Sequence, residues 1–202
     1  LRKTLERKGY SFKTSSDTEV LLFHLIEFGE SGIHDLNGFF GFAFYDKETK
    51  ETIVARDRFG IKPLHIYEDE HQLIFASELK AIFTFDITKK INYSSLQLYF
   101  KFNYIPQPFS ILENCKKLEP GELLIWKDGK SKTKKYYTLP FTPQKYIFTD
   151  YKKAQLKLRE LLEESVSKRL VSDVPVGAFL SGGIDSSVIT ALASKHTKHL
   201  NT

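Results

Sequence analysis

The stretch of sequence that decides the fold reads Val174-Pro175-Val176-Gly177-Ala178-Phe179-Leu180-Ser181-Gly182-Gly183-Ile184-Asp185-Ser186-Ser187. Residues 174–180 form a continuous apolar run, which is typical of a parallel strand that is buried on both faces of its sheet. Residues 186–195 then predict a helix. A buried strand, a glycine-containing turn and a helix together predict the start of an α/β unit.

The turn at residues 181–187 has the composition of a site for phosphate groups. Two glycines allow the backbone to approach a ligand, and the next helix offers free N–H groups and the positive end of its dipole. Three serines add hydroxyl donors. The carboxylate of Asp185 would repel a bare phosphate, so its presence favours a bound Mg²⁺. A tight strand-to-helix turn capped by serines is the alternative, but the combination favours binding of a nucleotide's phosphates or of pyrophosphate.

The loop differs from two common nucleotide-binding motifs and resembles a third. It lacks the Lys of the Walker motif and the third glycine of the dinucleotide fingerprint. It resembles the pyrophosphate loop of ATP pyrophosphatases, and residues 172–177 (SDVPVG) resemble the lead-in of the asparagine synthetase family. The resemblance implies ATP and Mg²⁺ as cofactors and Asp185 as the contact for magnesium or pyrophosphate. It also implies ATP contacts at Leu180, Ser181, Gly182, Gly183, Asp185 and Ser186.

The region ahead of this unit predicts antiparallel structure. Phe alternates with smaller residues over positions 40–45, as expected of a strand with one heavy face and one light face. Residues 52–55, 64–67 and 73–76 continue the strand pattern with polar turns between them. We expect these strands to form one antiparallel meander.

Further elements are predicted on either side of a linker that contains prolines. Residues 96–102 predict a short helix, and residues 121–126 a strand that turns at residues 128–129 (Asp-Gly), with residues 136–137 as its partner. We place a domain boundary in the linker, between residues 1–145 and 146–202. Beyond it, Asp150 is placed to cap a helix that ends near Leu170 and has on one side Ala154, Leu158, Leu161, Leu162 and Ser165.

The front of the chain resembles the glutaminase domain of the same family. Residues 16–20 (SDTEV) fit a capping box, with Ser16 as the cap and Glu19 as its reciprocal partner. Taken alone, Asp17 is an acid in a first helical turn, where the helix dipole favours it. The family segment that this stretch resembles binds glutamine, and the resemblance implies that Asp17 receives the α-amino group of that substrate.

Three more segments resemble the family: residues 37–44 (NGFFGFAF), 56–64 (RDRFGIKPL) and 76–80 (ASELK). We interpret them as structural, with Arg56 and Asp57 fixing a corner by hydrogen bonds and charge. The resemblance implies an α+β glutaminase domain of the N-terminal-nucleophile-hydrolase type, built from antiparallel sheets and incomplete in this chain. It implies that the start of an α/β parallel-sheet ATP-pyrophosphatase domain follows.

The catalytic nucleophile of such a glutaminase is a Cys at the mature N-terminus, whose free amine can act as base. Here Leu1 stands first, and the chain contains no Met, so we expect a fragment of a longer protein. The resemblance therefore assigns no catalytic residue to this chain, and we expect these 202 residues alone to be inactive as a glutaminase. Cys115 is interpreted as a partly buried structural thiol.

The resemblance implies ATP-dependent synthesis of asparagine from aspartate, with glutamine or ammonia as nitrogen donor, through β-aspartyl-AMP and release of pyrophosphate. A related amidotransferase or a β-lactam-synthetase-like enzyme that adenylates another carboxylate is the alternative, since the acceptor pocket belongs downstream. A non-catalytic binding protein that retains the fold is disfavoured by the intact loop at residues 181–187.

Composition bears on the setting in which the protein acts. An apolar fraction of 41% predicts packed cores, and a net charge of +5 on scattered basic residues gives little support to nucleic-acid binding. One Cys fits a reducing compartment, and no apolar run reaches the length of a membrane span. We expect a cytoplasmic enzyme whose partners are glutamine, aspartate and ATP, with no nucleic acid or membrane among them, and with a homodimer as the assembly to test.

Overall fold

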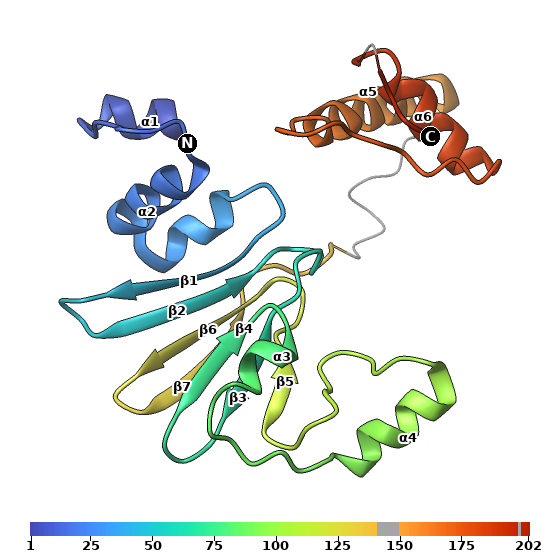
Figure 1. The fold of residues 1–202 in the computed structure, drawn as a ribbon. Helices are drawn as coiled ribbons and strands as arrows, with labels where there is room; N and C mark the ends of the chain where they lie inside the picture. The colour runs from blue at the N-terminus through green and yellow to red at the C-terminus, as the bar shows by residue number, and fades with distance from the viewer. Residues whose placement is uncertain (141–149, 198) are drawn as a thin grey trace. The chain divides into compact units, whose positions relative to one another are not determined.

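The computed structural model describes residues 1–140, 150–197 and 199–202. It divides the chain into two compact units, Leu1–Leu139 and Pro140–Thr202 (Figure 1). The predicted domain boundary, between residues 145 and 146, falls outside the described residues. Each unit contains a hydrophobic core of its own. Among the helices that the structure describes, none combines the length and the apolar character that crossing a membrane requires.

The first unit contains two antiparallel sheets, ordered β1-β2-β6-β7 and β4-β3-β5. The single predicted meander is therefore wrong: β2 pairs with β6 rather than with β3, because the chain after β2 turns out of the first sheet. The elements are α1 (Arg2–Arg7), α2 (Asp17–Phe28), the 3-10 helix η1 (Gly29–Asp35), β1 (Gly41–Asp46), β2 (Glu51–Arg56), β3 (His65–Glu68), β4 (Leu73–Ala76), α3 (Leu79–Ile82), α4 (Tyr93–Phe102), β5 (Cys115–Lys117), β6 (Glu122–Lys127) and β7 (Lys130–Lys135).

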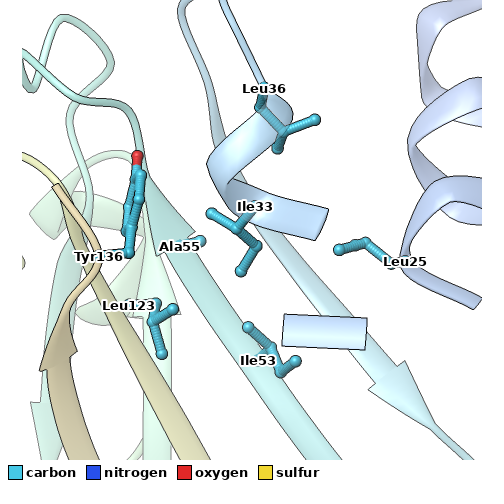
Figure 2. Packing of buried hydrophobic residues seen from close by; sticks show 7 residues of the cluster. All are labelled: Leu25, Ile33, Leu36, Ile53, Ala55, Leu123 and Tyr136. Atoms are coloured by element: carbon cyan, nitrogen blue, oxygen red, sulfur yellow. The ribbon is translucent and has the colours of Figure 1, made fainter. Parts of the chain in front are cut away.

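The first sheet lies between a helical layer and the second sheet. On one face, Ile53 and Ala55 of β2 pack with Leu25 of α2 and Ile33 of η1 (Figure 2). The rings of Phe40, Phe42 and Phe44 join this cluster, which confirms the predicted heavy face of β1. On the other face, Val54 packs with Leu64, Ile66, Leu118 and Leu124. Burial on both faces explains why β2 contains consecutive apolar residues rather than alternating apolar and polar ones.

Local signals set the ends of α2. Ser16 is the N-cap, and its Oγ accepts a hydrogen bond from the N–H of Thr18 at 3.1 Å. The helix ends at Gly29, whose φ of +57° favours glycine. The predicted N-cap is present, but the reciprocal capping box is not. Ser16 Oγ accepts from Thr18 rather than from Glu19, and the Glu19 carboxylate accepts from the N–H groups of Lys13 and Thr14 instead of that of Ser16. It thereby holds the segment that leads into the helix.

The hairpin of β6 and β7 turns at Asp128 and Gly129, as predicted, with φ values of +50° and +73°. Its second strand is Lys130–Lys135, so the prediction of residues 136–137 as the partner is wrong. A two-residue turn of this kind requires pairing to begin directly after it. Tyr136 and Tyr137 instead donate their backbone N–H groups to the carbonyl of Gly121.

The second unit contains α5 (Tyr151–Arg169) and α6 (Ile184–Ala193), which pack through Val166, Leu192 and Ala193. Asp150 caps α5, as predicted. Of the predicted apolar side, Leu162 packs against this core, whereas Leu158 and Leu161 are exposed.

The apolar run at residues 174–180 does not form the predicted buried strand. It contains one isolated bridge, a parallel one from Gly177 to Asn201, and the side chain of Phe179 is fully exposed. A strand is buried on both faces only when neighbouring strands and helices cover it, and the described part of this unit supplies a single bridge and two helices.

Candidate functional sites

Asp17 lies in the first turn of α2 and lines a cavity of about 630 Å³ within the first unit. The cavity lies between the N-terminus of α2, the start of β1 and the loop that follows β2. Its lining residues are Leu1, Arg2, Ser15, Asp17, Thr18, Val20, Leu21, Leu36, Asn37, Gly38, Phe39, Phe40, Gly41, Phe42, Lys62, Pro63 and Ser77. Predominantly apolar walls with a few polar groups are typical of a small-molecule site.

The cavity lining carries charges of both signs. Asp17 supplies a carboxylate, and Arg2 and Lys62 supply cations. Arg2 donates from Nη2 to the carbonyl of Ser16 at 3.2 Å and stacks over the ring of Phe12, so that it also ties α1 to the start of α2. A small zwitterion, with an ammonium group and a carboxylate, fits this pattern of charge.

The segment before α2 is held by a carboxylate whose charged form is favoured. Glu19 accepts from the backbone N–H of Lys13 at 2.9 Å and of Thr14 at 2.8 Å, and from the Thr14 hydroxyl at 2.6 Å. The bond from the Lys13 backbone, followed by that from the Thr14 side chain, lowers the pKa of Glu19. Ser15, which lines the cavity, lies within the segment that these bonds constrain.

The loop at residues 181–187 forms the second candidate site. Gly182 has a φ of +83°, a backbone conformation that favours glycine, and Gly183 is the N-cap of α6. In the structure as described, no side chain caps the N-terminus of α6. The Oγ atoms of Ser181 and Ser186 lie 3.1 Å apart, and Ser186 Oγ also donates to the carbonyl of Gly183 at 3.1 Å.

Asp185 lies in the first turn of α6 and is exposed, as Ser181 is, whereas Ser186 is half-buried. Across the part of the chain that the structure describes, no three His, Cys, Asp or Glu side chains gather into a metal site. One carboxylate beside a phosphate-binding helix end still suits Mg²⁺, which is held in proteins by one or two carboxylates together with substrate phosphates. The donor set of this loop therefore fits that ion.

Asp17 belongs to the first unit, and the six predicted ATP contacts belong to the second. Five of these six lie in the loop or in the first turn of α6, and Leu180, which is 49% exposed, directly precedes them.

Sequence reasoning missed the wall of the first cavity that Lys62 and Pro63 form. Residues 56–64 (RDRFGIKPL) were the available signal, because they match the family pattern although they form a loop.

Cys115 is a buried thiol in β5. Burial raises its pKa, and the neighbouring Ser110 side chain acts in the opposite direction. A protonated thiol is a weak nucleophile, and the burial of Cys115 agrees with its interpretation as a structural residue.

Two protein-family models match this chain, one in each of its two units. Residues 1–137 match the model of the glutamine amidotransferase domain family. The chain belongs to this family. Behind its amidotransferase domain, residues 157–202 match the asparagine synthase model.

Individual relatives of the amidotransferase chain match it over both of these regions. It is 39% identical over 203 residues to asparagine synthetase [glutamine-hydrolyzing] 1 of Bacillus subtilis, with 100% of this chain and 32% of that protein covered. It is also 39% identical over 195 residues to a putative asparagine synthetase [glutamine-hydrolyzing] 2 of Methanocaldococcus jannaschii, with 95% and 38% covered. The amidotransferase chain thus spans between 32% and 38% of these relatives.

A solved structure of glutamine phosphoribosylpyrophosphate amidotransferase from B. subtilis, complexed with ADP and GMP, also matches the amidotransferase chain. The two share 21% identity with a TM-score of 0.43, and the match covers 96% of this chain and 41% of that one.

Proposed function

We propose that this chain is part of a glutamine-hydrolysing asparagine synthetase. The observation that carries the proposal is the succession, in one chain, of an amidotransferase match over residues 1–137 and an asparagine synthase match over residues 157–202. Relatives of 39% identity that bear this name support it. Their names also favour aspartate over another acceptor carboxylate.

The first unit binds glutamine in the cavity at the N-terminus of α2. Asp17 receives the α-amino group, because it supplies the acidic side chain among the residues that line that cavity. The antiparallel sheets of this unit support an N-terminal-nucleophile type of glutaminase fold. Hydrolysis of the side-chain amide of glutamine there releases ammonia and leaves glutamate.

The second unit binds ATP at the loop of residues 181–187. Leu180, Ser181, Gly182, Gly183 and Ser186 contact the nucleotide, and Asp185 holds Mg²⁺. When bound, this ion neutralises the charge that develops on the phosphate oxygens. The uncapped N-terminus of α6 and the φ of Gly182 support the phosphate site. The parallel bridge from Gly177 to Asn201, on either side of α6, supports the start of a parallel-sheet domain.

The proposed synthesis of asparagine takes two chemical steps, adenylation of aspartate and attack by ammonia. A β-carboxylate oxygen of aspartate attacks the α-phosphorus of ATP, and the bond to pyrophosphate breaks to give β-aspartyl-AMP. Ammonia then attacks the acyl carbon, loses a proton and displaces AMP to give asparagine. Adenylation is needed because a free carboxylate is a poor electrophile, whereas AMP is a good leaving group. The small-molecule partners are therefore glutamine, aspartate and ATP.

The test uses the complete reading frame that contains this chain. Its product is purified, and pyrophosphate release is measured with ATP, Mg²⁺ and ammonia, with and without aspartate. We expect release that depends on aspartate and equals the asparagine formed. A folded protein that binds ATP without aspartate-dependent release would contradict the proposal and direct the search to another acceptor acid.

A further inference from the structure

One wall of the cavity that contains Asp17 is an irregular loop, yet two strongly polar side chains are buried beneath it. Arg56 is 4% exposed and Asp57 is fully buried, whereas the loop's own apolar side chains, Phe59 and Ile61, are 57% and 54% exposed. Packing of those side chains, which includes an edge contact of Phe59 with the ring of Tyr137, therefore contributes little to holding the loop in place. Lys62 and Pro63, which follow them, line the cavity.

The carboxylate of Asp57 binds the loop through its backbone. Oδ1 accepts from the N–H groups of Phe59 at 3.1 Å and Ile61 at 3.0 Å, and Oδ2 accepts from the N–H of Lys62 at 2.9 Å. The backbone of Asp57 is itself fixed to the residue that precedes β1, because its N–H donates to the carbonyl of Phe40 at 2.9 Å. The loop is thus attached to a residue that lines another part of the cavity.

The guanidinium of Arg56 binds the same loop from the carbonyl side. Nε donates to the carbonyl of Lys62 at 2.7 Å, and Nη2 donates to that of Gly60 at 2.7 Å. Nη1 donates to the carbonyl of Leu118 at 2.6 Å and to Gln107 Oε1 at 3.1 Å. Several acceptors in one plane suit the rigid fork of an arginine, which a lysine cannot reproduce.

Adjacent residues therefore hold both backbone groups of Lys62: Asp57 binds its N–H and Arg56 binds its carbonyl. Buried charges of this kind contribute little net stability, because desolvation offsets their attraction. A pocket wall, in contrast, must be held to within roughly 0.5 Å to select a ligand. The backbone contacts of this pair meet that need at Lys62 and Pro63.

We propose that Arg56 and Asp57 are positioning residues for the glutamine cavity, which they serve by fixing the backbone of Lys62 and hence the wall formed by Lys62 and Pro63. This inference rests on the proposed function of the cavity. It assigns the pair a role in glutamine use and none in the reaction of free ammonia, since ammonia supplied from solution does not require that wall.

The test compares two variants of the complete protein, Asp57→Asn and Arg56→Lys, with a matched control, Asp46→Asn. Asp46 also accepts from backbone N–H groups in a turn, those of Glu48 and Thr49, but it lies at the opposite end of β1 from Gly41 and the cavity. Asparagine formation is measured with glutamine and, separately, with ammonia. Because displacement of a binding group by about 1 Å costs up to about 100-fold, we expect the glutamine KM to rise at least about tenfold in both variants. The ammonia-dependent rate and the control should remain as in wild type.

Three other results would contradict either the positioning role of the pair or the glutamine site itself. Glutamine- and ammonia-dependent rates that fall together would show a purely structural role for the pair. An unchanged glutamine KM in either folded variant would also overturn the positioning role, and the milder Arg56→Lys keeps the test decisive where Asp57→Asn does not fold. A wild-type protein that uses ammonia but binds no glutamine would overturn the glutamine site itself, and this inference with it.

Discussion

The two candidate sites each place an aspartate in the first turn of a helix, but their helix ends differ. At α2, the side chain of Ser16 caps the end, and Asp17 lies beside a walled cavity. At α6, the cap is Gly183, which offers no side-chain acceptor, and Asp185 is exposed in the first helical turn. A capped end has already used part of its donor capacity, whereas an uncapped end presents its N–H groups to an anion. An aspartate in the first helical turn is therefore proposed to bind an amine in one unit and a metal–phosphate group in the other.

The largest effect is expected at the uncapped helix. Asp185→Asn in the complete protein should lower the rate of aspartate-dependent pyrophosphate release by about 100-fold or more, because it removes the charge proposed to hold Mg²⁺. Glutamine hydrolysis by the same protein should continue. Asp150→Asn is the control, since an asparagine oxygen can still cap α5. Pyrophosphate release within a factor of two or so of wild type in Asp185→Asn would contradict the metal role.

The cores of the two units offer a second contrast. Leu124 is fully buried between the two sheets, and Leu124→Ala should lower the free energy of unfolding of the first unit by about 2 to 5 kcal/mol. Leu156 of α5 is 68% exposed in this chain. Leu156→Ala should therefore change the free energy of unfolding of the second unit by less than about 0.5 kcal/mol. Urea denaturation followed by circular dichroism measures both. Equal effects would indicate that Leu156 is covered in solution.

At the capped helix, Asp17→Asn should raise the glutamine KM by about 10- to 100-fold, because a hydrogen bond to a charged group contributes roughly 1.5 to 3 kcal/mol. Ammonia-dependent asparagine formation should not change. Thr18, the next residue along α2, also lines the cavity, but Thr18→Val removes no charge and should have the smaller effect on KM. A parallel loss of both activities in Asp17→Asn would instead indicate a folding defect.

The smallest effect concerns the hydroxyl that closes the corner at Arg56. Tyr136 Oη donates to the carbonyl of Arg56 at 2.7 Å, and burial, together with the charge of Asp57, raises the Tyr136 pKa to about 12. The folded protein therefore retains this proton more strongly than the unfolded chain, whose value is 10.0. The stabilisation is complete below pH 10 and is lost as the pH rises towards about 12.

Tyr136→Phe should accordingly cost about 1 kcal/mol near neutral pH, and the difference from wild type should shrink between pH 10 and 12. Urea unfolding at several pH values measures it, with Tyr137→Phe as the neighbouring control. A difference from wild type that is constant up to pH 12 would show that the hydroxyl does not titrate with folding.

Much of the local structure could be predicted because its causes lie close together in the chain. Ser16 as a cap and the turn at Asp128 and Gly129 each follow from the conformation or hydrogen bonding of a few neighbouring residues. The loop at residues 181–187 was recognisable for the same reason. The start of α6 at Ile184, two residues ahead of the predicted start, is the ordinary uncertainty of a helix boundary.

The sequence alone therefore determined the two-part organisation, the caps and turns, and the residues expected to bind glutamine and ATP. Only the tertiary structure decided that β2 pairs with β6, and that Lys62 and Pro63 form a wall of the cavity that contains Asp17. Strand pairing and cavity walls join residues far apart in the chain. Burial on both faces of β2 stabilises the pairing, and the hydrogen bonds of Arg56 and Asp57 fix the geometry of the wall. Those terms exist only once the sheets are packed, so no short stretch of sequence records them.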